Sequence, residues 1–175
     1  KNSFDPCGSA FGRVGCRRPD GREWQDPAVN EINRLPMRSS FAAGERLSLD
    51  GVWKFHWVRN ASERPSGIGA VDYDDAAWGS MPVPGMWELN GYGDPVYVNI
   101  GYAWRGNFRN DPPYVPDAEN HVGSYRRTFD IPASWGGKDI FLSIGSATSN
   151  VYVWVNGRFV GYSEDSKLAA QFDIT

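Results

Sequence analysis

The residues best suited to chemistry lie in a loop-rich segment, residues 87–109, where aromatic and polar side chains mix without a regular period. They are Trp87, Tyr92, Tyr97, Tyr102 and Trp104, with Asn90, Asp94, Asn99, Arg105, Asn107 and Arg109 beside them. Aromatic faces can pack on the apolar C–H patches of a sugar, while amides and carboxylates hydrogen-bond to its hydroxyls. The same rings could instead fill a core, and the segment alone leaves both interpretations open. For Trp53, Trp78 and Trp154 we expect core positions.

Carboxylates occur in two clusters, one formed by Asp72, Asp74 and Asp75 and the other by Glu164 and Asp165. Hydrolysis of a glycoside requires two carboxyl groups that face each other across the scissile bond, one of them a proton donor with a raised pKa. The first cluster is typical of a solvated turn, and the second follows a predicted strand at a loop. We therefore expect neither cluster to be catalytic.

The two histidines also lack a catalytic setting. His56 lies on the polar face of a predicted strand, where a solvated histidine is expected, and His121 precedes another strand. The sequence contains no GxSxG, HExxH or GxxxxGK[ST] motif that would indicate a nucleophile, a zinc site or a phosphate loop. No residue is assigned a catalytic role.

Composition excludes several classes of function. The 175 residues carry a net charge of −3, and no basic cluster is larger than the pair Arg17–Arg18, so a nucleic-acid partner is not expected. No apolar run approaches the roughly 20 residues that span a bilayer, so no membrane association is expected either. Cys7 and Cys16 could form a disulfide or remain free thiols, and no further ligand lies near enough in sequence for a metal site. The compartment stays open.

Short alternating segments dominate the chain. From Val52 onward, the side chains of residues 47–58 alternate between an aromatic face and a more polar face. This pattern predicts a strand with Trp53, Phe55 and Trp57 on its core face. Residues 150–163 predict a hairpin whose Asn156-Gly157 turn is of type I′, because both central residues need a positive φ. Further strands are predicted at residues 121–132, at residues 138–145, which are apolar enough to be central, and at residues 169–174. The pattern predicts an all-β, jelly-roll β-sandwich with little helix.

The domain boundaries follow from composition. Residues 1–23 have no apolar periodicity and are interpreted as a flexible leader. Residues 24–46 contain prolines that interrupt any helix and predict an extended arm anchored by Trp24, Ile32, Leu35 and Met37. Residues 47–175 form the predicted jelly roll. The sequence stops inside a predicted strand, so we expect the jelly roll to be incomplete and the polypeptide to continue.

Five segments carry a resemblance to a known family. INRLPMRSSF, LSLDGVWKFHW, VPGMWELNGYGDPVYVNIGYAW, PPYVPDAENHVGSYRRTF and VYVWVNGRFVGYSEDSKLAAQFDIT follow one another from about Trp24 to the end. In order and spacing they resemble the amino-terminal portion of glycoside hydrolase family 2, in its long bacterial β-galactosidase branch.

The resemblance implies a sugar-binding domain of an enzyme that hydrolyses terminal β-galactosides with retention, using two glutamates of a TIM barrel. That barrel is not in this sequence, so the chain alone is expected to be inactive. The resemblance further implies Mg²⁺ and Na⁺ in the parent enzyme, contacts with its remaining domains, and a homo-oligomer. The alternatives are a free-standing carbohydrate-binding module and a fragment without a ligand.

Two site residues are implied by the resemblance. In PVYVNIGY, Asn99 matches the asparagine that reaches into the galactose pocket, and Ile100 matches its neighbour in the pocket wall. A short amide can both donate to and accept from vicinal hydroxyls, and a branched apolar side chain shapes a wall. The family's aspartate that binds Na⁺ and a galactose hydroxyl would lie further along, in a stretch this chain lacks.

Overall fold

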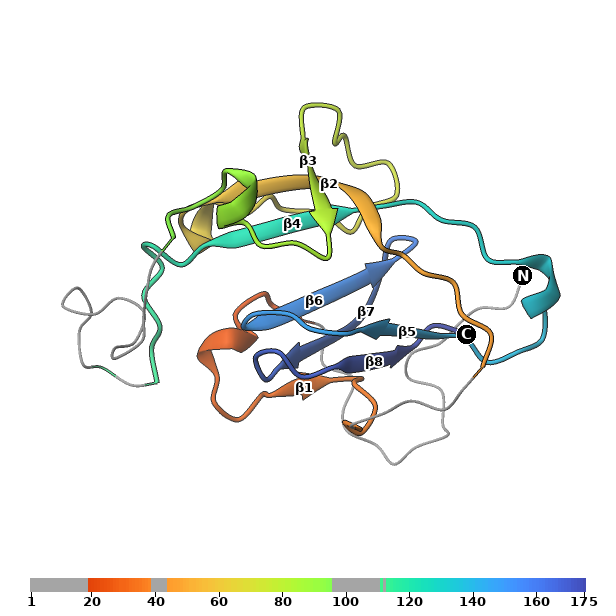
Figure 1. Cartoon of the computed structure of the whole chain (residues 1–175). Coiled ribbons are helices and arrows are strands. Elements are labelled where there is room, and N and C mark those ends of the chain that lie inside the picture. The colour runs from red at the N-terminus through yellow and green to blue at the C-terminus, as the bar shows by residue number, and fades with distance from the viewer. Residues whose placement is uncertain (1–18, 39–43, 96–110, 112) are drawn as a thin grey trace. The chain divides into compact units, whose positions relative to one another are not determined.

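The computed structural model describes residues 19–38, 44–95, 111 and 113–175 (Figure 1). These residues form eight strands, all paired antiparallel, and four 3₁₀ helices of three residues each. The prediction of an all-β fold is confirmed. Within the described ranges, no helix has the length and apolar character needed to cross a membrane.

The chain divides into two compact units. The first unit comprises the described residues of Lys1–Ala43, Gly69–Val71 and Ile131–Thr175. The second comprises those of Gly44–Ile68 and Asp72–Asp130.

The second unit contains a three-stranded sheet in the order β3–β2–β4, in which β2 is central (Figure 1). Its strands are β2 Gly51–Val58, β3 Gly79–Val83 and β4 Val122–Arg126, and its 3₁₀ helices are Ala61–Glu63 and Glu88–Asn90. The predicted alternation of β2 is confirmed, because Phe55 is 1% exposed and Val52 70%. Phe55 and Met81, the latter fully buried on β3, form the centre of this unit's core.

Strand β4 is shorter than the predicted strand 121–132. Its pairing with β2 ends at Lys54–Arg126. The next side chain, Arg127, is exposed and donates through Nη1 to the backbone carbonyls of Leu49 and Asp50, 2.6 and 3.0 Å away. The Arg127 side chain thus donates to backbone carbonyls in the segment that precedes β2, beyond the last residue pair of β2 and β4.

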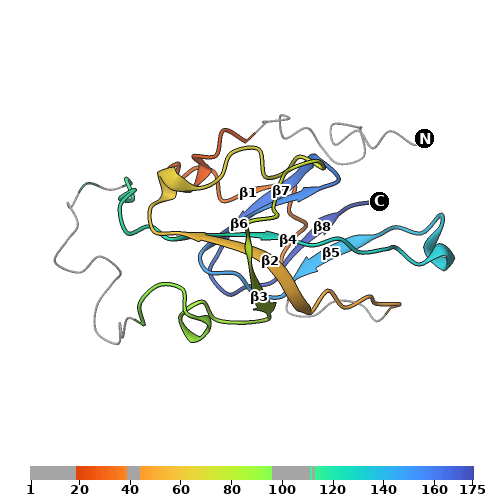
Figure 2. The same cartoon turned by 90° about the horizontal axis from the view of Figure 1, so that it is seen from above.

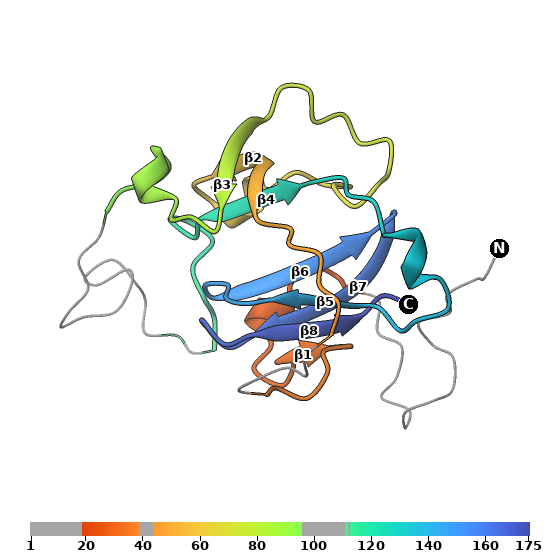
Figure 3. The same cartoon turned by 45° about the vertical axis from the view of Figure 1, so that its right-hand side comes forward.

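The first unit is built around the β6–β7 hairpin, with β6 Asn150–Val155 and β7 Arg158–Glu164 (Figure 3). Asn156 and Gly157 have φ values of 50° and 81°, as the type I′ turn requires, so this prediction is confirmed. The unit also contains β1 Glu31–Ile32, which pairs with β7, β5 Phe141–Ile144, β8 Ala170–Asp173, and the 3₁₀ helices Glu23–Gln25 and Ala133–Trp135.

Two expectations for this unit are wrong. Among the described strands β5 pairs with β8 alone, so it is not central (Figure 2), and Phe141 is 45% exposed. Trp154 is 38% exposed, because β6 turns Val153 toward the buried cluster with Val160 and Phe172 and thereby points Trp154 to the opposite face.

The arm is bound along β7 and β8 by polar contacts. The Leu35 backbone N–H donates to the Gln171 carbonyl over 2.9 Å, and the Asn33 side-chain amide donates to the Val160 carbonyl over 3.0 Å. Glu23, 1% exposed, accepts a hydrogen bond from the Tyr152 hydroxyl at 2.8 Å. Burial raises the pKa of Tyr152, and the Glu23 carboxylate raises it further.

Candidate functional site

The two predicted sugar-binding residues, Asn99 and Ile100, lie outside the described residues, as do Tyr97, Tyr102, Trp104, Arg105, Asn107 and Arg109. The structure describes the chain on both sides of them. We call residues 91–95 the entry flank and residues 117–121 the exit flank. Both belong to the second unit.

An aromatic pair lies next to the entry flank: Trp57, near the end of β2, and His121, directly before β4. The Trp57 and His121 rings meet edge to face, with centroids 4.9 Å apart. Gly93 lies directly on them, because a Cβ at Gly93 would be 3.5 Å from Trp57 Cζ2 and 3.6 Å from His121 Nδ1. Gly93 also has φ +71°, a conformation that side-chain-bearing residues rarely adopt. The entry flank therefore lies close to His121, the residue that precedes β4.

A single arginine joins the two flanks. Arg59 Nη1 donates to Glu119 Oε2 over 2.8 Å, and Arg59 Nη2 contacts Asp94 Oδ2 at 3.3 Å. The guanidinium also lies 5.7 Å from the centroid of the Trp57 ring, within range of a cation–π interaction. The hydrogen bond from Arg59 lowers the pKa of Glu119, and the hydrogen bonds to Glu119 and then Asp94 raise the pKa of Arg59.

Besides Arg59, residues 60–62 also form hydrogen bonds with the exit flank. The Ala61 backbone N–H donates to the Asp117 carbonyl at 3.1 Å, and Ser62 Oγ donates to Asp117 Oδ2 at 2.6 Å. The Glu119 N–H donates to Asn60 Oδ1 at 3.1 Å. Main-chain and side-chain bonds thus fix the exit flank to the 3₁₀ helix Ala61–Glu63 and its N-cap Asn60.

The described aromatic residues of the segment 87–109 pack within the second unit. Trp87 is half-buried, donates from Nε1 to the Tyr125 hydroxyl, and lies across Gly123, where a Cβ would come within 2.5 Å of its ring. Tyr92 is half-buried with its ring 4.7 Å from that of Phe55. For these two residues the core interpretation holds. Gly91, with a φ of 85°, ends the 3₁₀ helix Glu88–Asn90 in the left-handed conformation.

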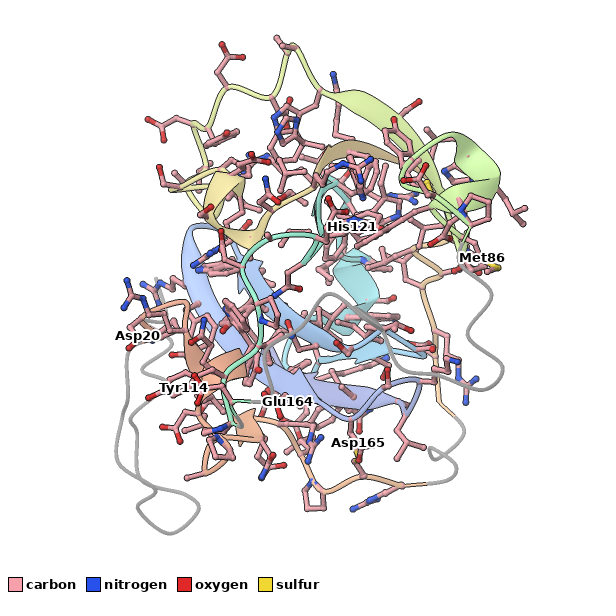
Figure 4. The ribbon with its side chains drawn as sticks, turned by 90° about the vertical axis from the view of Figure 1, so that its left-hand side faces the viewer. Asp20, Met86, Tyr114, His121, Glu164 and Asp165 are labelled. Carbon is pink, nitrogen blue, oxygen red and sulfur yellow. The ribbon has the colours of Figure 1, made fainter. Side chains whose placement is uncertain are left out.

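Carboxylates of both clusters have partners among the described residues. Asp74 Oδ1 accepts the Ala76 N–H at 3.0 Å, as in a turn, and Asp75 pairs with Arg126 at 2.9 Å. Glu164, at the end of β7 (Figure 4), accepts a hydrogen bond from the Tyr162 hydroxyl. Within the described part of the chain, no three His, Cys, Asp or Glu side chains group so as to hold a metal ion.

His56 is not the solvated histidine that its strand position predicts. It is half-buried, and its ring stacks on Trp78 with centroids 5.5 Å apart and planes 25° from parallel. Trp78, in the connection between β2 and β3, thus covers the His56 ring. The polar face of β2 is therefore only partly in contact with solvent.

Sequence reasoning named Asp94 as a candidate sugar ligand and did not single out Arg59 or Glu119. The structure brings the three together at one point at the end of β2. No local pattern links them, because the partners are 35 and 60 positions from Arg59 along the chain.

Comparison with known proteins gives a consistent result. Residues 47–175 match the model of the sugar-binding domain of glycosyl hydrolases family 2. The chain is 40% identical to a β-galactosidase of Halalkalibacterium halodurans over 86% of its length and 16% of that protein. It is 43% identical to a β-galactosidase of Priestia megaterium over 73% of its length and 12% of that protein. It is 36% identical to a β-galactosidase large subunit of Leuconostoc lactis over 87% of its length and 28% of that protein.

Among solved structures, the chain resembles a calcium-binding mutant of Bacteroides uniformis β-glucuronidase 2 with a TM-score of 0.51. That match has 22% identity and covers 74% of this chain and 12% of the other. At this identity the likeness shows the fold alone. The chain spans only 12–28% of the length of the three β-galactosidases.

Proposed function

Because this chain belongs to glycosyl hydrolase family 2 and carries its sugar-binding domain, we propose that it is part of a β-galactosidase that hydrolyses terminal non-reducing β-D-galactosides with retention. The observation that supports this most is the match of residues 47–175 to that domain, together with identities of 34–43% to proteins named β-galactosidase. The remaining domains of such an enzyme are the first partners of the chain.

The proposed contribution of the chain is to bind substrate. Asp74, Asp75 and Glu164 are occupied by turn, arginine and tyrosine partners, and none is assigned to acid–base or nucleophilic work. We assign the two catalytic glutamates to the part of the enzyme outside this chain. Asn99 then binds galactose hydroxyls through its amide, and Ile100 lines the pocket wall.

The described residues do not fit a metal ion, since no suitable group of ligands comes together among them. The Mg²⁺ and Na⁺ expected for the parent enzyme are therefore assigned to ligands elsewhere in it. We also propose that the parent enzyme is a homo-oligomer.

The test compares substrates in the full-length enzyme. A nitrophenyl β-galactoside should be turned over much faster than the matching β-glucuronide, and this chain by itself should turn over neither. Equal or greater activity on the β-glucuronide would contradict the proposed substrate class, and turnover by purified chain alone would contradict its non-catalytic role.

A further inference from the structure

We propose that Met86 and Leu89, which we call the apolar tip, form a surface through which this chain docks onto another domain of its own polypeptide. This inference rests on the proposed function, because it requires the chain to be part of a longer enzyme. It adds to that proposal by naming a contact surface. The residues that carry it all belong to the second unit.

The apolar tip is open to solvent. Leu89 is 81% exposed, the highest value among the large hydrophobic side chains that the structure describes, and Met86 is 63% exposed. Single exposed apolar residues are common on protein surfaces, but these two lie within four consecutive residues. Their side chains are therefore available for a contact outside this unit.

The backbone beneath the apolar tip is held by hydrogen bonds. The Trp87 carbonyl accepts from the backbone N–H groups of Asn90 and Tyr92 at 2.9 and 3.0 Å. The side-chain amide of Asn90 donates to the Met86 carbonyl at 2.8 Å. A surface that is already ordered in this way loses little conformational entropy when it binds a partner.

Trp87 anchors the same turn to the sheet. Its Nε1 donates to the Tyr125 hydroxyl, and its ring centroid lies 6.1 Å from that of Phe55. A Cβ at Gly123 would come within 2.5 Å of the Trp87 ring, so the turn lies close against β4. Within this turn Trp87 thus supplies the contacts with the unit, and the apolar tip on either side of it faces solvent.

The size of the tip favours a partner on the same polypeptide. The chain spans at most 28% of the three β-galactosidases, so most of such an enzyme lies outside it. A domain joined to this one is present at a high effective concentration, and a contact of a few side chains is then enough to dock it. A stable interface between separate copies usually buries more than about 1,000 Å² in total, which needs far more than two side chains.

The partner surface should be an apolar hollow. Leu89 and Met86 would fill its centre, and the flexible Met86 side chain can adapt to an irregular gap. Glu88, which is exposed beside Leu89, would lie at the edge, since protein interfaces combine an apolar centre with a polar rim.

The first experiment follows methionine oxidation by hydrogen peroxide in the unaltered full-length enzyme, with peptide mass spectrometry as the readout. Met81, fully buried on β3, is the matched control. Compared with the enzyme unfolded in denaturant, the native enzyme should form sulfoxide at least about fivefold more slowly at Met86 as well as at Met81, because a covered thioether is shielded from the oxidant. Less protection at Met86, with Met81 still protected, would overturn the proposal.

The second experiment identifies what covers the tip. The photoreactive residue p-benzoylphenylalanine replaces Leu89 in the full-length enzyme, a change that folding should tolerate because Leu89 is 81% exposed. Irradiation of the native enzyme should join position 89 to a peptide of the same polypeptide outside these 175 residues, and irradiation in denaturant should not. Crosslinked dimers would indicate a second copy, and crosslinks within the 175 residues would indicate a contact inside the chain. Either result, or no crosslink in the native enzyme, contradicts the proposal.

Activity measured on the same samples keeps this inference apart from the proposed function. A full-length enzyme that cleaves no nitrophenyl β-galactoside contradicts the proposed function, whatever covers the tip. An active enzyme with an unprotected Met86 contradicts the docking surface alone.

Discussion

Gly93 and His121 lie against each other, with only 3.6 Å between His121 Nδ1 and the position of a Cβ on Gly93. The chain leaves this point at Asp94 and returns to it at Glu119, and Arg59 binds both of those residues. The proposed galactose ligand, Asn99, belongs to the stretch between them. Both flanks thus contact Arg59, the residue that follows the central strand β2.

Gly93→Ala should destabilise the chain by about 1–2 kcal/mol, because a Cβ is disfavoured at a φ of +71°. Denaturant unfolding measures the change. Gly44→Ala is the control, since Gly44 is not at a positive φ and a Cβ there meets nothing within 4 Å. Equal stability of the Gly93→Ala and Gly44→Ala proteins would show that the left-handed backbone at Gly93 is not required.

Phe172→Ala should lower the free energy of unfolding by about 3–5 kcal/mol, since a fully buried ring is replaced by a cavity. The partner substitution is Phe141→Ala, at a phenylalanine of the adjoining strand that is 45% exposed. Its effect should be clearly smaller. Similar losses for the two variants would contradict the position of the core at β7 and β8.

Stability should fall at alkaline pH because of Tyr152 and Tyr162. Burial raises the pKa of both hydroxyls in the folded chain, and Glu23 and Glu164 respectively raise them further. The unfolded chain releases these protons near the ordinary tyrosine pKa of about 10, so their contribution is complete below that pH and is lost as the pH rises above it.

The measurement is the denaturant midpoint as a function of pH. Tyr162→Phe should reduce the alkaline loss of stability, whereas Tyr114→Phe, at a residue 64% exposed, should leave it unchanged. An alkaline loss that is identical in wild type and in Tyr162→Phe would exclude this tyrosine as a cause.

Sequence reasoning predicts the elements whose determinants are local. The alternation of Trp53, Phe55 and Trp57 gives the core face of β2, and Asn156-Gly157 gives the hairpin turn, because side-chain period and positive φ are properties of neighbouring residues. Directly after the end of β4, Arg127 contacts the carbonyls of Leu49 and Asp50, which belong to a distant segment. No local pattern could have indicated it.

The same limit applies to the site. Residue types alone make Asn99 one of several candidate sugar ligands, and only a family resemblance singles it out and adds Ile100. Both lie outside the described residues, so their role remains a prediction. Arg59 is an ordinary polar residue after a strand when read in sequence. Its two carboxylate partners become visible only when folding brings Asp94 and Glu119 to it.

The most direct measurement is the inhibition constant of galactose for the full-length enzyme carrying Asn99→Ala. Loss of the amide should weaken binding by about 1–3 kcal/mol, the effect of removing one partner of a buried polar contact, which is roughly a 5- to 150-fold rise in the constant. An inhibition constant equal to that of the wild-type enzyme would show that this domain does not supply a galactose ligand through Asn99.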